Sequence, residues 1–387
     1  MSRLNVVFIC GSLEPGKDGV GDYTRRLACE IIRQGNLASI IALNDTYCKT
    51  KKKENQISDN INVSTLRLSS TTSIDKRIFQ AKCWVNERNV DWLSLQYVPY
   101  SFSAKGIPLN LATQLRKIVL YQKWHIMFHE LAVGIENEAS IKHRLIGKAQ
   151  LYIIKSLRKK LKPQVVHTQT QLYLKLLNDL NFKVTLLPLF SNIPIKNSKP
   201  NDKGIKPKLR NEIVFVLFGG IHSNVPFENF AIEAVSFSRT NNITISLLTI
   251  GRNGNELKRW LDCAKNHELQ IINMGEQSHS TISKIMSSST IGITTTPLPL
   301  VEKSGSVAAM LAHKLPIICV SRDWNIKGSN ILKIKDIYNY QKGNLETVVL
   351  KIMRSIENDN TPQGHLVSQI AKSFLTSLES KQRNGNP

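Results

Sequence analysis

A short polar segment, Glu302 to Ser306, carries the side chains of this chain that are best suited to chemistry. It places a carboxylate, a cation, two hydroxyls and a glycine between an apolar strand and a short apolar helix. The start of a helix offers unpaired N–H groups and a partial positive charge, so it suits a phosphate or another anion. Pro316 then leads into a second buried strand. This pattern predicts a doubly wound α/β domain with a ligand at the polar turn, although an ordinary βα turn would look the same.

Polar or glycine-rich segments also follow other apolar strands. Gly11 to Tyr23 follows the first strand, and its glycines would let the backbone approach a ligand closely. The other segments are His129-Glu130, His167-Thr168-Gln169, Gly219-Gly220 and Gly251-Arg252. Taken singly, each is typical of a turn or of a structural histidine. Because the carboxyl ends of parallel strands meet at one edge of a sheet, their shared position favours a ligand site.

Short β-rich apolar runs alternate with helical patterns along the chain, which predicts parallel sheets with helices between the strands. One helix is expected from about Asp22 to Ile32, with a single buried face, and Gly35 should end it. We expect strands in the first half near 6–10, 38–43, 63–67, 92–97, 125–129, 165–168 and 184–188. In the second half we expect strands near 213–218, 244–250, 270–274, 291–295 and 315–320.

The length of 387 residues favours two domains over one. Residues 196–210 are polar, basic and rich in proline and glycine, a composition that predicts a linker. We therefore expect an α/β protein with a first Rossmann-like domain over 1–195 and a second over 211–362, the two doubly wound domains facing each other across a cleft. A final helix, 363–378, is expected to pack back on the first domain.

The formal net charge of +23 calls for an anionic partner or surface. Residues 139–178 contain no acidic side chain, but many lysines and arginines alternate there with apolar residues. A basic amphipathic helix of this type can lie on an anionic membrane surface. A merely solvated face and a nucleic-acid surface are the alternatives, and we recognise no nucleic-acid-binding module. A second basic cluster, Lys49 to Lys53, is expected to be a loop.

The remaining composition points to an intracellular globular protein. No apolar run approaches the ~18 residues that a membrane-spanning helix needs. The first residues show no cleavage-site pattern of a signal peptide. The six cysteines have no paired spacing, which favours a reducing compartment over a disulfide framework or a zinc site. We therefore expect a cytoplasmic protein, held peripherally on the inner face of the cytoplasmic membrane.

With these motifs assembled, the chain resembles the retaining nucleotide-sugar glycosyltransferases of the GT-B fold, particularly glycosyltransferase family 4. The resemblance covers nearly the whole chain, and it is best at Gly19 to Tyr23, Leu95 to Tyr100, Phe128 to Glu130, Pro188 to Pro194 and Glu302 to Pro316. It implies that His129 lies beside the transferred sugar and that Glu302 contacts the donor, which makes these two the catalytic candidates. The implied acceptor-side residues are Asp22, Tyr23, Gln96 and Tyr97. The donor-binding candidates are Gly19, Gly21, Gly219, Gly220, Arg252, Lys303, Ser304, Gly305 and Ser306.

Two positions depart from the family pattern. Counted back from Pro316, the second of the family's two glutamates falls at Ala309, which cannot provide a carboxylate to a ribose. The arginine and lysine that hold the diphosphate in the family are missing after Gly219-Gly220. Arg252 or Lys303, together with the N–H groups of the helix start, would have to replace them.

These features predict the transfer of a sugar from a nucleotide diphosphate sugar to a glycan or lipid-linked acceptor, with retention, in cell-surface glycan or glycolipid synthesis. We expect no metal and no cofactor besides the donor substrate, because fixed cations can stabilise the departing diphosphate. We expect no nucleic-acid partner. Two alternatives stay open: a catalytically degenerate GT-B protein that binds nucleotide sugar or a partner transferase, and a GT-B nucleotide-sugar epimerase.

Overall fold

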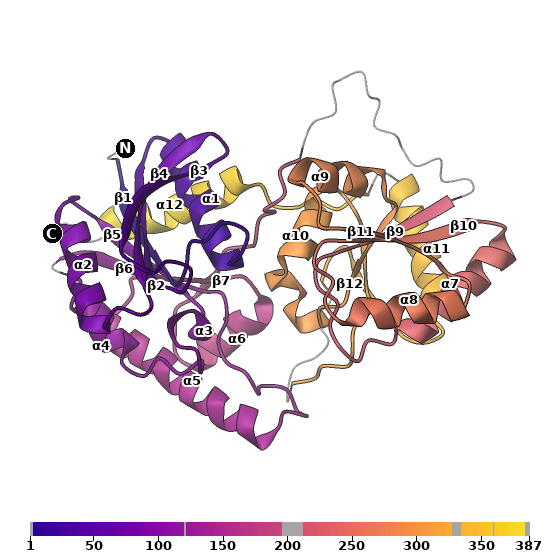
Figure 1. The fold of residues 1–387 in the computed structure, drawn as a ribbon, viewed down its shortest axis with the longest axis horizontal. Coiled ribbons are helices and arrows are strands. Elements are labelled where there is room, and N and C mark those ends of the chain that lie inside the picture. The colour runs from indigo at the N-terminus through magenta and orange to yellow at the C-terminus, as the bar shows by residue number, and fades with distance from the viewer. Residues whose placement is uncertain (1–2, 120, 196–211, 327–333, 359, 384–387) are drawn as a thin grey trace. The chain divides into compact units, whose positions relative to one another are not determined.

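The chain forms two compact units in a computed structural model that describes residues 3–119, 121–195, 212–326, 334–358 and 360–383. Unit 1 comprises the chain up to Pro188 together with the segment from Val367, and unit 2 comprises Leu189 to Leu366 (Figure 1). The linker expected at 196–210 lies outside the described residues. The segment before it, which the sequence assigns to the first domain, is grouped with unit 2, because Ile193 packs into the core of that unit.

Unit 1 is built on a mainly parallel sheet with the strand order β3-β4-β2-β1-β5-β6-β7-β8. Its strands are β1 Asn5–Cys10, β2 Leu37–Asp45, β3 Lys52–Ser58, β4 Ile61–Ser69, β5 Trp92–Tyr97, β6 Lys123–Phe128, β7 Val165–Thr168 and β8 Thr185–Leu186. Every expected strand of the first half is present. The central strands β1 and β5 are almost entirely buried, as a sheet covered by helices on both faces requires.

The edge strand β3 corrects the expectation of a loop at Lys49 to Lys53. Lys52 and Lys53 begin this strand, which pairs with β4 antiparallel, unlike the other strand pairs of the sheet. Its sequence, KKENQIS, is too polar to give the signal of a buried strand. Lysines on an edge strand discourage pairing with another chain, so this composition suits the position.

The helices of unit 1 are α1 Gly19–Arg33, α2 Ile74–Asn86, α3 Pro99–Phe102, α4 Leu111–Arg116, α5 Ile141–Leu161, α6 Gln171–Asp179 and α12 Val367–Arg383. Helix α1 begins earlier than expected because Asp18 caps it, accepting hydrogen bonds from the N–H groups of Val20 (2.9 Å) and Gly21 (3.0 Å). Gly19 and Gly21 therefore lie in the first turn of the helix. A Cβ atom on Gly21 would come within 2.5 Å of the Ser12 carbonyl oxygen, so only glycine fits there.

The C-terminal helix α12 belongs to unit 1, where it lies in yellow among the indigo elements of Figure 1. It begins at Val367, a few residues after the expected start. Phe374 is fully buried, with its ring centroid 5.7 Å from that of Phe8 and 4.9 Å from that of His125. The last helix is thus a core element of the unit that contains the first strand.

Unit 2 has a parallel six-stranded sheet in the order β11-β10-β9-β12-β13-β14. Its strands are β9 Glu212–Phe218, β10 Thr244–Ile250, β11 Gln270–Gly275, β12 Ile291–Thr294, β13 Ile317–Cys319 and β14 Ile337–Asn339. Its helices are α7 Phe227–Asn241, α8 Glu256–Asn266, α9 His279–Ser288, the 3₁₀ helix η1 Leu298–Lys303, α10 Gly305–Ala312 and α11 Leu345–Glu357. The five expected strands are present, and β14 is an addition.

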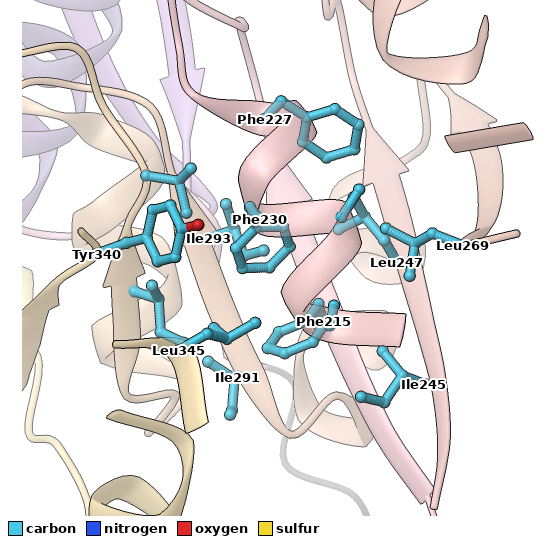
Figure 2. Packing of buried hydrophobic residues seen from close by; sticks show 14 of the residues in the cluster. Phe215, Phe227, Phe230, Ile245, Leu247, Leu269, Ile291, Ile293, Tyr340 and Leu345 are labelled. Carbon is cyan, nitrogen blue, oxygen red and sulfur yellow. The ribbon is translucent and has the colours of Figure 1, made fainter. Parts of the chain in front are cut away.

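Both faces of the unit 2 sheet are covered by apolar cores. Figure 2 shows the core on the α7 side, where Phe215 of β9 packs against Phe230 with the ring centroids 5.5 Å apart. The next residue of the strand, Val216, belongs to the core on the α10 side. Because successive side chains of a strand point to opposite faces, β9 is apolar on both faces from Ile213 to Phe218. This confirms the doubly wound arrangement expected from the sequence.

Candidate functional sites in the two units

The turn after β9 in unit 2 brings two of the predicted donor-binding residues together. Gly219 has φ of +93°, a backbone conformation that favours glycine. A Cβ atom on Gly219 would lie 2.5 Å from the hydroxyl oxygen of Ser306, so the turn and the start of α10 are in close contact. Gly220 follows in the same turn. The carboxyl end of the sheet therefore meets the N-terminus of a helix at this point, as the sequence predicted.

Asn253 holds this turn from the neighbouring loop. Its side-chain amide donates a hydrogen bond to the Gly219 carbonyl (2.7 Å), and its backbone carbonyl accepts one from the N–H of Ile221 (3.1 Å). Its Oδ1 atom is buried and has no hydrogen-bond partner among the described residues. The sequence analysis selected Arg252 in this loop, and it did not predict that Asn253 would bind the glycine turn.

His222 lies at the same edge of unit 2, in the electrostatic field of two cations. The backbone N–H of His222 donates to the hydroxyl of Thr295, and its Nδ1 atom lies at the same distance of 3.0 Å from that hydroxyl. Partial burial of the ring, and then the positive charges of Lys303 and Arg322, lower the pKa of His222. Both cations therefore act electrostatically on His222, which follows Gly220 by two residues. Of the two, only Lys303 was singled out from the sequence.

The start of α10 has the features of an anion-binding helix terminus. Ser304 is the N-cap, and its hydroxyl accepts a hydrogen bond of 3.4 Å from the N–H of Val307. Gly305 and Ser306 form the first turn, and Glu302 and Lys303 end the preceding η1 helix, which the sequence did not predict. Ala309, the position counted as the second glutamate, is fully buried in the core beneath the helix.

Arg252 lies on the loop after β10 and is paired with another charged side chain. Its Nε atom is 3.0 Å from a carboxylate oxygen of Glu276, and the two side chains are 58% and 66% exposed. An exposed ion pair of this kind contributes at most ~1 kcal/mol, so an anionic ligand could displace Glu276 at little cost.

In unit 1, the predicted residues Tyr23 and Gln96 both contact the predicted His129. The ring lies directly after β6, its Nε2 is 2.9 Å from Oε1 of Gln96, and Tyr23 packs edge-on against it with centroids 4.9 Å apart. The side-chain amide of Gln169, which follows β7, is 2.9 Å from Nδ1. His129 is only 5% exposed. Burial lowers its pKa to about 3, despite the opposing hydrogen bond from Gln169, so the ring is neutral at ordinary pH.

Asp22 and Tyr97 have structural contacts in unit 1. The Asp22 carboxylate accepts hydrogen bonds from the N–H of Gly16 (3.2 Å) and from Arg25 (2.8 Å), which closes the loop before α1. Tyr97 is fully buried between Phe102 and Phe128, and burial raises the pKa of its hydroxyl.

A cavity of about 490 Å³ lies at the carboxyl ends of β1, β2, β4 and β5 in unit 1. Its lining is rich in hydroxyl groups, among them those of Ser12, Ser70, Tyr100 and Ser103, and it also includes the amide of Asn44 and the oppositely charged Lys17 and Asp18. The sequence did not predict it, because its lining comes from four separate loops. A lining of this composition suits a ligand with many hydroxyl groups.

A buried ion network is hydrogen-bonded to Ser12, one of the residues that line this cavity. The guanidinium of Arg67 contacts Asp45 (2.7 Å), Glu14 (2.6 Å) and Glu54 (3.3 Å), and it is almost fully buried. Burial alone would raise the pKa of Asp45, but the hydrogen bond and charge of Arg67 lower it overall. Ser12 donates to the same carboxylate (3.2 Å). The loop after β1 is thereby tied to β2, β3 and β4.

Within the described part of the chain, no three His, Cys, Asp or Glu side chains are grouped so that they could hold a metal ion. None of the described helices combines the length and the apolar composition that crossing a membrane requires.

Comparisons with known proteins identify solved structures that have the same architecture. No protein-family model and no curated protein sequence matches the chain. Solved structures match over nearly its whole length. HepE of Anabaena, in complex with UDP and glucose, is 12% identical with a TM-score of 0.58 over 99% of each chain. A glycosyltransferase from Rickettsia africae is 14% identical with a TM-score of 0.55, over 98% of this chain and 94% of that one.

A third similar structure is named for a different activity. A putative UDP-N-acetylglucosamine 2-epimerase from Listeria monocytogenes is 9% identical with a TM-score of 0.57, over 100% of this chain and 98% of that one. At these identities the similarity establishes the fold alone. With its two parallel-sheet Rossmann-like units, this protein has the GT-B fold of nucleotide-sugar glycosyltransferases.

Proposed function

We propose that this protein is a glycosyltransferase that moves a sugar from a nucleotide diphosphate sugar to an acceptor, with retention of configuration. The observation that carries the proposal is the cluster at the edge of unit 2: the Gly219 turn contacts Ser306 in the first turn of α10, and Lys303 directly precedes the N-cap of that helix. Lys303 and Arg322 also act electrostatically on His222 of the same edge. Cations and free N–H groups at one sheet edge form a site for a diphosphate. That HepE was solved with UDP and glucose on the same fold supports this reading.

The same cluster would also assist the chemical step. When the bond between the sugar and the diphosphate breaks, negative charge grows on the departing phosphate oxygen. Lys303, Arg322 and the first N–H groups of α10 would stabilise that charge without a metal ion, since they are held in place before the reaction. We assign Gly219, Gly220, Ser304, Gly305 and Ser306 to the same diphosphate site, with Arg252 at its margin and Glu302 toward the sugar.

The acceptor would bind unit 1. We propose that the hydroxyl-lined cavity at the ends of β1, β2, β4 and β5 takes part of a glycan, and that Lys17 interacts with an anionic group on it. The neighbouring group of Tyr23, Gln96 and His129 would border the reacting centre, with Gly19, Gly21 and Asp22 shaping the loop between them. His129 would contribute as a neutral group, because burial keeps its pKa far below ordinary pH.

Helix α5 would hold unit 1 against an anionic lipid surface on the cytoplasmic side, near a lipid-linked acceptor. Its buried face includes Ile153 and Leu157, whereas Leu145 and Tyr152 are 61% and 67% exposed. The lysines and arginines of the helix are all exposed, and they are Lys142, Arg144, Lys148, Lys155, Arg158, Lys159 and Lys160. Apolar side chains that project between cations are typical of helices that lie on anionic membranes.

A protein that binds nucleotide sugar without transferring it is the second candidate. The buried Ala309 favours it, because this position lacks the carboxylate that the resemblance would place on a ribose.

Nucleotide titration tests the proposal. We expect UDP or another nucleoside diphosphate to bind, and Lys303→Ala to weaken binding by ~1–3 kcal/mol because a charge-assisted contact is lost. Lys258→Ala, at an exposed lysine of α8, is the control and should leave the affinity unchanged. If no member of a panel of nucleotide diphosphates binds, the proposal is wrong. Binding without transfer or hydrolysis of any nucleotide sugar would support the second candidate.

A further inference from the structure

A chain of six buried polar side chains runs from His129 into the interior of unit 1. Beyond His129 and Gln96, the amide nitrogen of Gln96 donates to the Ser94 hydroxyl (2.8 Å), and that hydroxyl is 2.7 Å from Nδ1 of His125. Nε2 of His125 is in turn 3.0 Å from Nδ1 of His167. At the opposite end, the chain begins with Gln169, whose side-chain amide contacts Nδ1 of His129. Each of the six is at most 5% exposed.

Strand register explains why the six side chains meet. Ser94 of β5 lies directly opposite His125 of β6. Gln96 is two residues beyond Ser94, and His129 is four beyond His125, so alternation puts them on the same face of the sheet. His167 of β7 is paired with Met127, two residues from His125, and therefore faces the same side. Phe374 of α12 covers the two inner histidines.

The hydrogen bonds of this chain all run in one direction. A neutral imidazole has one donor and one acceptor nitrogen, and the oxygen of a glutamine amide only accepts. Since Oε1 of Gln96 faces Nε2 of His129, that nitrogen carries the proton, and Nδ1 accepts from Gln169. The Ser94 hydroxyl accepts from Gln96, and the only acceptor for its own hydrogen among the described residues is Nδ1 of His125. The hydroxyl therefore donates to His125, and His125 donates to His167. All three histidines are then neutral with the proton on Nε2.

No member of the chain can change alone. If one histidine exchanged its proton between nitrogens, two donors or two acceptors would face each other in a buried link, which costs ~1–3 kcal/mol. The opposite direction also satisfies every link, but it requires both amides and all three histidines to switch together. Charging a ring is opposed as well, because burial lowers the pKa of His129 to about 3, of His167 to about 4, and of His125 well below its ordinary value.

We propose that Gln169, Gln96, Ser94, His125 and His167 are positioning residues that act as one unit and hold His129 neutral, with its proton on Nε2 and its ring fixed in direction. Both ring nitrogens of His129 are thereby occupied by the protein, so this histidine presents a fixed dipole and transfers no proton. The link to turnover rests on the proposed function, but the state of the ring does not.

Nitrogen-15 NMR of the histidine rings tests this on the full-length protein without any substrate. Protonated and unprotonated ring nitrogens have well-separated shifts, so each tautomer can be identified. We expect His125, His129 and His167, assigned by single substitution, each to show one neutral form with the proton on Nε2 from pH 8 to 5. A charged ring in this range, or different tautomers among the three, would overturn the proposal, as would all three with the proton on Nδ1.

Ser94→Ala tests whether the chain acts as a unit. It removes the central link without touching His129, and we expect the His129 nitrogen shifts to move toward the average of two tautomers. Ser39→Ala is the matched control, because Ser39 is a buried serine of β2 that accepts a hydrogen bond from Trp84. An unchanged His129 spectrum in a folded Ser94→Ala protein would refute the coupling.

If this variant does not fold, Gln169→Met tests the other end of the chain. A His129 spectrum identical to that of the wild type would then refute the coupling equally. A protein that fails every transfer assay would refute the proposed function and leave these spectra as they are.

Discussion

Acid should destabilise unit 1 steeply, because it buries three neutral histidines. An unfolded histidine has a pKa of about 6.5, whereas burial lowers the folded pKa of His129 to about 3, of His167 to about 4, and of His125 well below its ordinary value. The unfolded chain therefore binds more protons at any pH between these values. The stability is fully present above about pH 6.5 and is lost as the pH falls toward the folded pKa values. Each histidine changes the free energy of unfolding by up to ~1.4 kcal/mol per pH unit.

From pH 7.5 to 5.5 each histidine should destabilise unit 1 by ~1.4 kcal/mol, and the three together by ~4 kcal/mol. Urea unfolding at the two pH values measures this, and near-UV circular dichroism reports on unit 1 through Trp84, Trp92 and Trp124. The two units can unfold in separate transitions, so each is fitted separately.

Replacing one histidine measures its contribution to the loss of stability on acidification. His167→Asn keeps an acceptor near the position of Nδ1 but cannot be protonated, so the loss on acidification should shrink by ~1.4 kcal/mol. His143→Asn, on the exposed surface of α5, is the control and should leave the loss unchanged. Equal stability of unit 1 at both pH values, or a His167→Asn protein that behaves as the wild type, would refute the reasoning.

Two further predictions concern α12 and α5. Phe374→Ala should lower the free energy of unfolding of unit 1 by ~3–5 kcal/mol, since it removes a fully buried ring; calorimetry that showed only a small change would contradict the core role of α12. Charge reversal to Glu at the C-terminal half of α5 should release the protein from anionic vesicles and leave nucleotide binding intact, as each cation near such a surface contributes ~1 kcal/mol. Co-sedimentation that ignores lipid charge and salt would refute the membrane proposal; the positions are Lys155, Arg158, Lys159 and Lys160.

The sequence predicted the central strands well because they are rich in apolar and β-branched or aromatic residues, as in VVFIC of β1 and the Trp, Leu and Tyr residues of β5. The strands it missed lack that signal: β3 is polar, and β14 has only three residues, Ile337–Asn339. Helix α1 was placed late because the N-cap, Asp18, precedes two glycines, which normally weaken a helix. Local composition therefore indicates buried segments, but edges and helix ends depend on tertiary neighbours.

The candidate site was predictable only in part, for a similar reason. Motifs that follow strands drew attention to His129, Lys303 and Ser306, because all parallel strands end at one edge. Partners such as Thr295 and Arg322 come from other loops, and no local pattern marks them. The histidine chain does have a signal in the sequence, since Ser94 and Gln96 alternate with apolar residues in the buried strand β5, and His125 interrupts the buried run of β6. Reading that alternation across neighbouring strands would have suggested a polar layer.

The place of α12 has a consequence for biosynthesis. Unit 1 contains β1, yet the helix that covers Phe8 and His125 follows the whole of unit 2 in the chain. All of unit 2 is synthesised in between, so it can fold while unit 1 is still incomplete. During translation, the surface of the first sheet that includes Phe8 and His125 therefore stays exposed until α12 has been made. Chaperones that bind nascent chains would therefore have a long-lived binding surface on the first sheet. A chain truncated before Val367 would lack α12, and the core of unit 1 would stay incomplete.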